Sequence, residues 1–114
     1  MVSSLADAPE SRADDHASAR PGGEWTFLTN HAHVLICLAK DSSARQRDIA
    51  HDVGITERAA QKIISELEAG GYVERIKVGR RNRYVLHEDI ALRHPLEAHR
   101  DIGSLLDLIT GPRD

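Results

Sequence analysis

Cysteine is almost absent from this chain of 114 residues, and its single thiol, Cys37, excludes an internal disulfide framework or a zinc site built from several cysteines. Aromatic residues make up only 4% of the sequence, which argues against a protein that stacks the bases of single strands. No apolar run approaches the roughly 18–20 residues that span a bilayer, and residues 1–23 lack the apolar core of a signal peptide. The composition predicts a cytoplasmic protein of one domain that is not associated with a membrane.

The first 23 residues differ in composition from the rest of the chain. They hold few large apolar side chains and end in Pro21-Gly22-Gly23. Such a segment cannot bury enough surface to offset the entropy lost on ordering. We therefore expect residues 1–23 to form a disordered tail.

After the tail, three segments are typical of helices. The first covers 31–40, with Thr29 or Asn30 as its cap, and the second covers about 46–52. The third starts at Thr56 and ends at the glycine pair 70–71. Between the second and third helices, Gly54 supplies the left-handed turn that a close helix–helix corner needs.

The pattern then changes to the alternation of a β-hairpin. Residues 72–78 and 83–86 read as two strands joined by a turn at 79–82. Five basic residues lie within nine positions of this hairpin, against one neighbouring acid at Glu74, although the whole chain carries a net charge of −3. A last helix is expected to begin near Pro95 and to run to Ile109.

This order of elements predicts an α+β, mostly helical winged helix-turn-helix domain over 24–92, with a two-stranded basic wing and a C-terminal dimerisation helix at 93–110. Residues 26–86 resemble the winged-helix bacterial transcriptional regulators of the MarR and ArsR type, on the segment RQRDIAHDVGITERAAQKIISELEAGGYVERIKVGRRNRYVL. The resemblance implies a homodimer that binds duplex DNA, often as a repressor. It identifies neither an operator nor an effector ligand.

The third helix is the candidate for reading bases, because the second helix of this motif lies in the major groove. Its polar side supplies side chains that can pair with base edges: Glu57, Arg58, Gln61 and Lys62. The hairpin is expected to reach the minor groove or nearby phosphates with Lys77, Arg80, Arg81, Asn82 and Arg83, of which 80–82 lie at its tip. Further candidates for phosphate contact are Thr29, Asn30, Arg45, Gln46, Arg47 and Thr56.

The C-terminal helix carries more apolar surface than a small core is expected to absorb. We expect its stripe to pair with the same helix of a second copy, and the stripe consists of Leu96, Ile102, Leu105, Leu106 and Ile109. Gly103 would permit close approach of the two helices. The alternative is that the stripe folds back onto the first helix of its own chain.

Three other functions have weaker support in the sequence. Seven histidines suggest a metal or ligand sensor of the ArsR type, but their spacing forms no compact ligand set, so neither a metal nor a cofactor is expected. A protein–protein interaction module is the stronger alternative, since the net charge is slightly acidic. No phosphate loop or catalytic signature is present, and we do not expect an enzyme.

Overall fold

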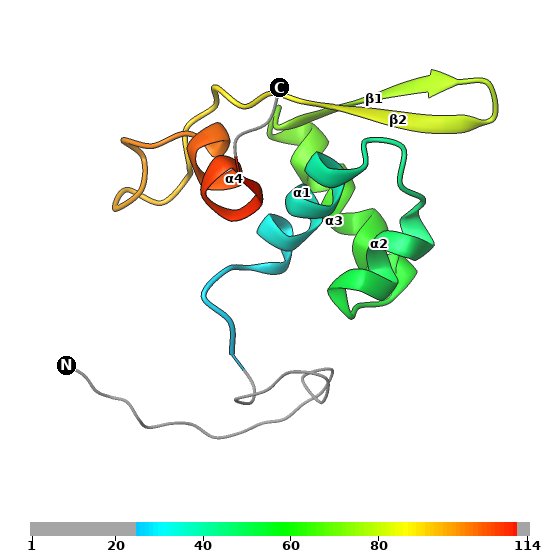
Figure 1. The fold of residues 1–114 in the computed structure, drawn as a ribbon, viewed down its shortest axis with the longest axis horizontal. Helices are drawn as coiled ribbons and strands as arrows, with labels where there is room; N and C mark the ends of the chain where they lie inside the picture. Colours follow the sequence, from blue (N-terminus) through cyan, green and yellow to red (C-terminus); the bar gives the residue numbers. More distant parts are fainter. Residues whose placement is uncertain (1–24, 112–114) are drawn as a thin grey trace.

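The computed structural model describes residues 25–111, and the predicted tail at 1–23 lies outside them. Four helices and one hairpin follow one another in the chain (Figure 1): α1 (Asn30–Lys40), α2 (Gln46–Val53), α3 (Glu57–Ala69), β1 (Val73–Val78), β2 (Arg81–Leu86) and α4 (Ile102–Thr110). The two strands pair antiparallel. This mostly helical arrangement is compatible with the predicted winged helix.

Local capping signals fix where the helices begin and end. The Thr29 hydroxyl accepts a hydrogen bond from the amide of Ala32 at the start of α1, and the Thr56 hydroxyl does the same for Ala59 in α3. Helix α2 ends at Gly54, whose φ of +88° belongs to the left-handed region that favours glycine. These boundaries agree with those predicted from the sequence.

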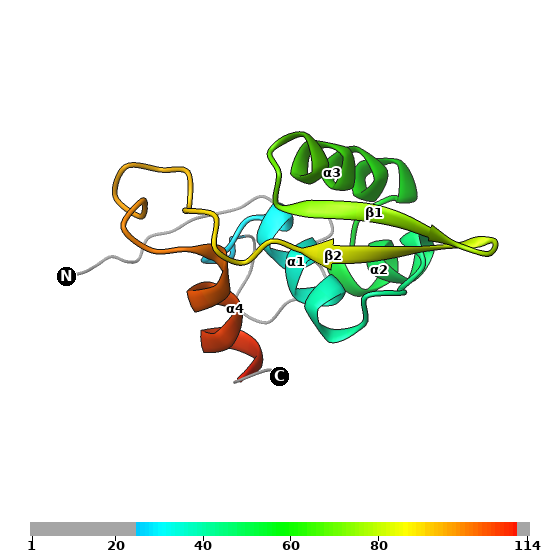
Figure 2. The same ribbon diagram turned by 90° about the horizontal axis from the view of Figure 1, so that it is seen from above.

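One apolar core joins all the elements. α1, α2 and α3 pack on one another, α4 packs on α1, and the base of the hairpin covers α3 and α1. The buried residues of this core are Val34, Leu35, Leu38, Ile49, Val53, Ile63, Ile64, Leu67, Tyr72, Val73, Tyr84, Ile102 and Leu106. The hairpin extends away from this body, at the opposite end of the molecule from α4 (Figures 1 and 2).

The hairpin turn is shorter than we expected. Val78 pairs with Arg81 and Lys77 pairs with Asn82, so that only Gly79 and Arg80 form the turn. Gly79 has a φ of +64°, which suits a tight two-residue connection. The expectation that Arg81 and Asn82 lie at the tip was therefore wrong, because both belong to β2.

The C-terminal helix begins later than Pro95. Residues 94–100 form turns instead, in which the amide of Glu97 donates to the carbonyl of His94 and the amide of Arg100 donates to that of Glu97. The helix starts at Ile102, where the Asp101 carboxylate caps it by accepting from the amide of Ser104 at 2.8 Å. Pro95 therefore lies in the loop before α4, and not at the start of the helix as predicted.

Helix α4 also divides the predicted apolar stripe. Ile102 and Leu106 are buried against the chain's own core, whereas Ile109 is 47% exposed. Leu108, which was not part of the predicted stripe, is 79% exposed. Leu105 is half-buried, and Leu96 lies exposed in the preceding turns, outside the helix. Two of the five expected dimer contacts are therefore core residues, as in the alternative where the helix folds back onto α1.

Gly103 serves a contact within the chain. A Cβ atom at this position would lie 3.0 Å from the Cβ of Glu88 and 3.1 Å from its carbonyl oxygen. The glycine lets α4 approach the segment that follows the hairpin, and its amide donates to the Glu88 carbonyl. This contact within the chain gives a physical reason for a glycine at this position.

Within residues 25–111, no helix has the length and apolar composition needed to cross a membrane. In the same part of the chain, no three side chains of His, Cys, Asp or Glu lie together as a set of metal ligands.

Candidate nucleic-acid interface

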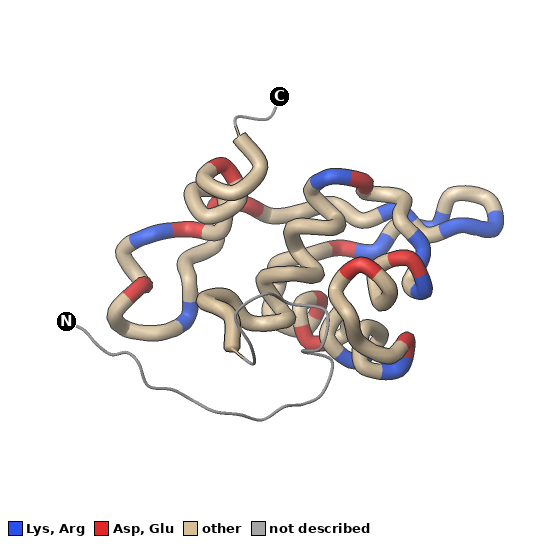
Figure 3. The backbone as a smooth tube through the Cα atoms, turned by 60° about the horizontal axis from the view of Figure 1, so that its bottom comes forward, with Lys and Arg blue, Asp and Glu red and all other residues tan. Residues whose placement is uncertain are grey.

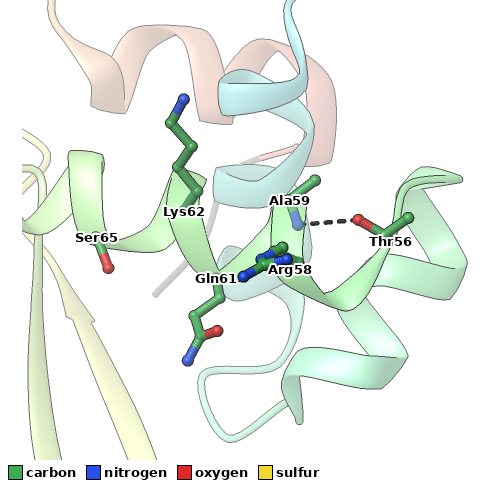
Figure 4. Close-up of a pocket in the computed structure, with 6 residues that line it drawn as sticks. All are labelled: Thr56, Arg58, Ala59, Gln61, Lys62 and Ser65. Atoms are coloured by element: carbon green, nitrogen blue, oxygen red, sulfur yellow. Dashed lines mark hydrogen bonds between the residues drawn. The ribbon is translucent and has the colours of Figure 1, made fainter.

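Helix α3 presents a polar face on the side opposite its buried residues. Ala60, Ile63, Ile64 and Leu67 pack into the core because they recur at helical spacing. The outer face carries Arg58, Gln61, Lys62 and Ser65, which border a shallow concavity (Figure 4). Within residues 25–111, Arg58, Gln61 and Lys62 form no side-chain hydrogen bond or ion pair, although the charge of Lys62 acts on the Glu66 carboxylate. These groups are therefore available to another molecule.

The start of α3 is held firmly. The amide of Ala59 donates to the Thr56 hydroxyl at 3.0 Å, so this oxygen already serves as the helix cap. Glu57 is the first residue of the helix and is exposed. The left-handed corner at Gly54 sets the angle at which α3 leaves α2. These residues fix the direction in which the polar face points.

The polar face has two sides. Figure 4 shows the side chain of Lys62 pointing away from those of Gln61 and Ser65. Glu66 lies one turn after Lys62, and His31 at the start of α1 contacts its carboxylate with an N–O distance of 2.7 Å. This hydrogen bond lowers the pKa of Glu66. One side of α3 is therefore bordered by the start of α1.

The candidate phosphate contacts at the start of α1 lie on this side. Both Thr29 and Asn30 are exposed, and they precede His31, which contacts α3. The Thr29 hydroxyl caps the helix, and the Asn30 side chain lies 3.1 Å from the ring nitrogen Nδ1 of His33. The N-terminus of α1 thus lies near the C-terminal half of α3.

The hairpin borders the other side of α3. Arg75 of β1 forms a two-pronged ion pair with Glu68 of α3, with N–O distances of 3.0 and 3.1 Å. Sequence reasoning counted Arg75 among the basic residues of the wing but did not find this pair. Its charge is already balanced by Glu68, so Arg75 differs from the other basic residues of the hairpin.

The free positive charge of the wing lies nearer its tip. Lys77, Arg80 and Arg83 are exposed, and none of them has an ion-pair partner among residues 25–111. Arg81 is exposed too, but its guanidinium donates to the carbonyl of Ser43 in the loop between α1 and α2. Asn82 is half-buried in β2. Figure 3 shows the basic residues gathered along the hairpin.

The start of α2 lies close to the base of this wing through the same loop. The amide of Tyr84 in β2 donates to the carbonyl of Ser42, three residues before Arg45. Arg45 and Arg47 are exposed, and Gln46 is half-buried at the first position of α2. The basic side chains of α2 and of the wing therefore lie on neighbouring segments.

This arrangement matches the needs of duplex recognition. Arg and Gln side chains can bind guanine and adenine edges through paired hydrogen bonds, and Glu can accept from cytosine. Free Lys and Arg groups on a projecting hairpin can neutralise phosphates or enter a minor groove. Ser65 was missed by the sequence analysis, although its spacing of seven from Arg58 and four from Gln61 places it on the same face.

The family comparison decides the class of this protein. Residues 27–88 match the model of the sugar-specific transcriptional regulator TrmB, a stretch that covers α1 to α3 and the complete hairpin. The chain belongs to the TrmB family. The resemblance to MarR- and ArsR-type proteins thus predicted the right class of winged-helix regulator, while the family that matches is TrmB.

A relative of the TrmB-family chain was also found among curated proteins. It is an uncharacterized protein of Methanocaldococcus jannaschii, 31% identical over 78 residues. The match covers 68% of this chain but only 17% of the relative. The chain therefore spans about a sixth of the relative's length.

Proposed function

We propose that this TrmB-family chain regulates transcription by binding a specific sequence of duplex DNA as a dimer. α3 enters the major groove with Arg58, Gln61 and Lys62, and Glu57 lies at its leading end. The wing places Lys77, Arg80 and Arg83 on the backbone or in the adjacent minor groove. The starts of α1 and α2 contact phosphates on either side.

One observation carries this proposal. The outer face of α3 holds three long polar side chains that form no hydrogen bond or ion pair within residues 25–111. It lies between the start of α1, which contacts α3 through His31 and Glu66, and the basic hairpin, which contacts it through Arg75 and Glu68. Unpartnered polar side chains also occur on helix faces that only contact water, so this face alone does not distinguish the two functions. A basic hairpin tied to one side of the helix, with a family match that includes both elements, supports DNA binding instead.

The dimer part of the proposal rests on the outer face of α4. Leu108 and Ile109 at the end of this helix are 79% and 47% exposed, and Leu105, one turn before them, is half-buried. Pairing of two such faces would relate two copies of α3 by a two-fold axis. A two-fold arrangement with α3 helices about 34 Å apart would fit a palindromic operator.

We further propose that binding represses transcription, as the resemblance to MarR- and ArsR-type regulators implies, by covering a promoter that overlaps the operator. In a run-off assay with a template that carries the selected site, transcript yield should fall as the protein is added. An increase in transcript would indicate an activator.

The proposed site is tested by selecting bound sequences from a random duplex pool. In titrations of the selected duplex, Arg58→Ala or Gln61→Ala should each relax base preference at one or two positions, at a cost of about 1–3 kcal/mol. Arg100→Ala, which removes an exposed arginine from the turns before α4, is the matched control and should leave the preference unchanged. Absence of binding to any duplex at low salt would favour a protein–protein module.

A further inference from the structure

The hairpin is attached to the helical body on both of its edges. On the β1 edge, Arg75 binds Glu68 of α3. On the β2 edge, the amide of Tyr84 donates to the Ser42 carbonyl at 2.9 Å, and the Arg81 guanidinium donates to Ser43. The direction of the wing is thus set by contacts with two different parts of the body.

The contact of Arg75 is the more specific of the two. Its Nε and Nη2 atoms donate to the two carboxylate oxygens of Glu68 at 3.1 and 3.0 Å. Its guanidinium carbon also lies 5.9 Å from the centre of the Tyr84 ring, which is buried in the core. The side chains of Arg75 and Glu68 are 34% and 29% exposed, so solvent screens this pair less than a fully exposed one.

The partner of Arg75 belongs to the helix that carries the candidate base contacts. Glu68 lies two turns after Gln61, and residues seven apart occupy the same side of a helix. Beyond Arg75 in β1, Lys77 has no ion-pair partner in the part of the chain that the structure describes. The pair therefore joins α3 to the strand that leads to the free charges of the wing.

We propose that Arg75 is a positioning residue and not a DNA contact, and that its pair with Glu68 fixes the angle of the wing relative to α3. The consequence for DNA rests on the function proposed above. A wing held at one angle places Lys77 and Arg80 at a fixed distance from the groove that α3 enters. Glu68 then favours DNA binding in spite of its negative charge.

The sign of the effect of Glu68 separates this proposal from simple electrostatics. Removing an acid from a surface that faces phosphates ordinarily raises affinity for DNA, because it reduces repulsion. If Glu68 holds the wing in place, Glu68→Gln should instead lower affinity for the selected duplex by about two- to fivefold, the range expected for a well-formed surface pair. Arg75→Gln should lower affinity for the selected duplex by a similar factor. The slope of log affinity against log salt should change less than it does when a phosphate contact is removed.

Glu74→Gln is the matched control. Glu74 lies beside Arg75 in the same strand and contacts His87, which follows β2, at 3.4 Å, so its contact does not reach α3. Glu74→Gln removes one negative charge, as Glu68→Gln does, but it breaks no contact between the wing and α3. Affinity should stay the same or rise.

A measurement on the free protein makes the test independent of DNA. We expect the order parameters of backbone amides in residues 76–83 to fall from about 0.85 toward 0.6 in Glu68→Gln and Arg75→Gln. They should remain high in Glu74→Gln and recover in the charge-reversed double variant Glu68→Arg with Arg75→Glu. Affinity for the duplex should recover in the same double variant.

The outcomes separate the two proposals. Unchanged order parameters in Glu68→Gln, or a gain in affinity equal to that of Glu74→Gln, would overturn the positioning role. Failure of the charge reversal to restore either quantity would overturn it as well. Failure of the wild-type chain to bind any duplex would instead overturn the proposed function, and with it the effect of the wing angle on DNA.

Discussion

Individual side chains in this protein divide into those already engaged within the fold and those free for a partner. Thr56 and Asp101 use their oxygen atoms as helix caps, and Glu68 balances Arg75. Arg58 and Lys77 form no such contact within residues 25–111. A residue's type alone did not reveal this division, since Arg75 and Lys77 lie two positions apart in one strand.

Asp101 gives a prediction about pH at the residue scale. Hydrogen bonds from Ser104 lower the pKa of Asp101, so the folded state holds its carboxylate ionised more strongly than the unfolded state does. The stabilisation is complete above the ordinary range of aspartate and is lost as pH falls through the lowered pKa. Urea unfolding between pH 6 and pH 2 should therefore show a loss of stability from this residue.

The control for this prediction is Asp101→Asn, because asparagine caps a helix without titrating in this range. Its free energy of unfolding should depend less on pH than that of the wild type. Equal pH dependence of the two proteins would mean that the Asp101 cap does not contribute to acid sensitivity.

At the scale of elements, α4 has one face in the core and one face exposed. Leu106 is 0% exposed, whereas Leu108 on the same helix is 79% exposed. We expect Leu106→Ala to lower the free energy of unfolding by about 2–5 kcal/mol, because it removes buried methyl groups and leaves a cavity. Leu108→Ala, measured by the same chemical denaturation at low protein concentration, should change it little. A similar cost for both would contradict the burial of this helix on α1.

The wing gives a second prediction at this scale. Lys77→Ala combined with Arg80→Ala should reduce the slope of log affinity against log salt by about 2, since each lost phosphate contact releases about one counterion fewer. Affinity should weaken on all duplexes alike. The measurement is a set of titrations at several salt concentrations, and an unchanged slope would mean that the tip of the wing does not touch the backbone.

For the whole molecule, the exposed face of α4 predicts self-association. Leu108→Asp combined with Ile109→Asp places two charges on that face and spares the buried Leu106, so the monomer should still fold. Sedimentation equilibrium at micromolar concentration should give a dimer for the wild type and a monomer for the variant. The variant should also lose preference for palindromes over half-sites.

A monomeric wild type that binds single half-sites would disprove the dimer. Circular dichroism of the double variant provides the control for folding. Helix content should match that of the wild type, because neither substituted side chain is buried in the core.

The sequence by itself determined the limits of α1, α2 and α3 and the presence of the hairpin. Caps such as Thr56, the left-handed glycine at 54 and the apolar period of α3 act over a few residues, so they can be read without the fold. The same period identified the outward face of α3 with Arg58 and Gln61, because burial on one side of a helix implies exposure on the other.

Only the tertiary structure decided which charges are free and which way α4 faces. Arg75 pairs across 7 positions and Arg81 reaches across 38, and no local pattern encodes such partners. Likewise, the apolar residues of α4 exceed one stripe, and their order cannot say whether Leu106 or Leu108 meets the core. That choice depends on how Gly103 packs against Glu88 and on the surface that α1 offers, both of which exist only once the chain has folded.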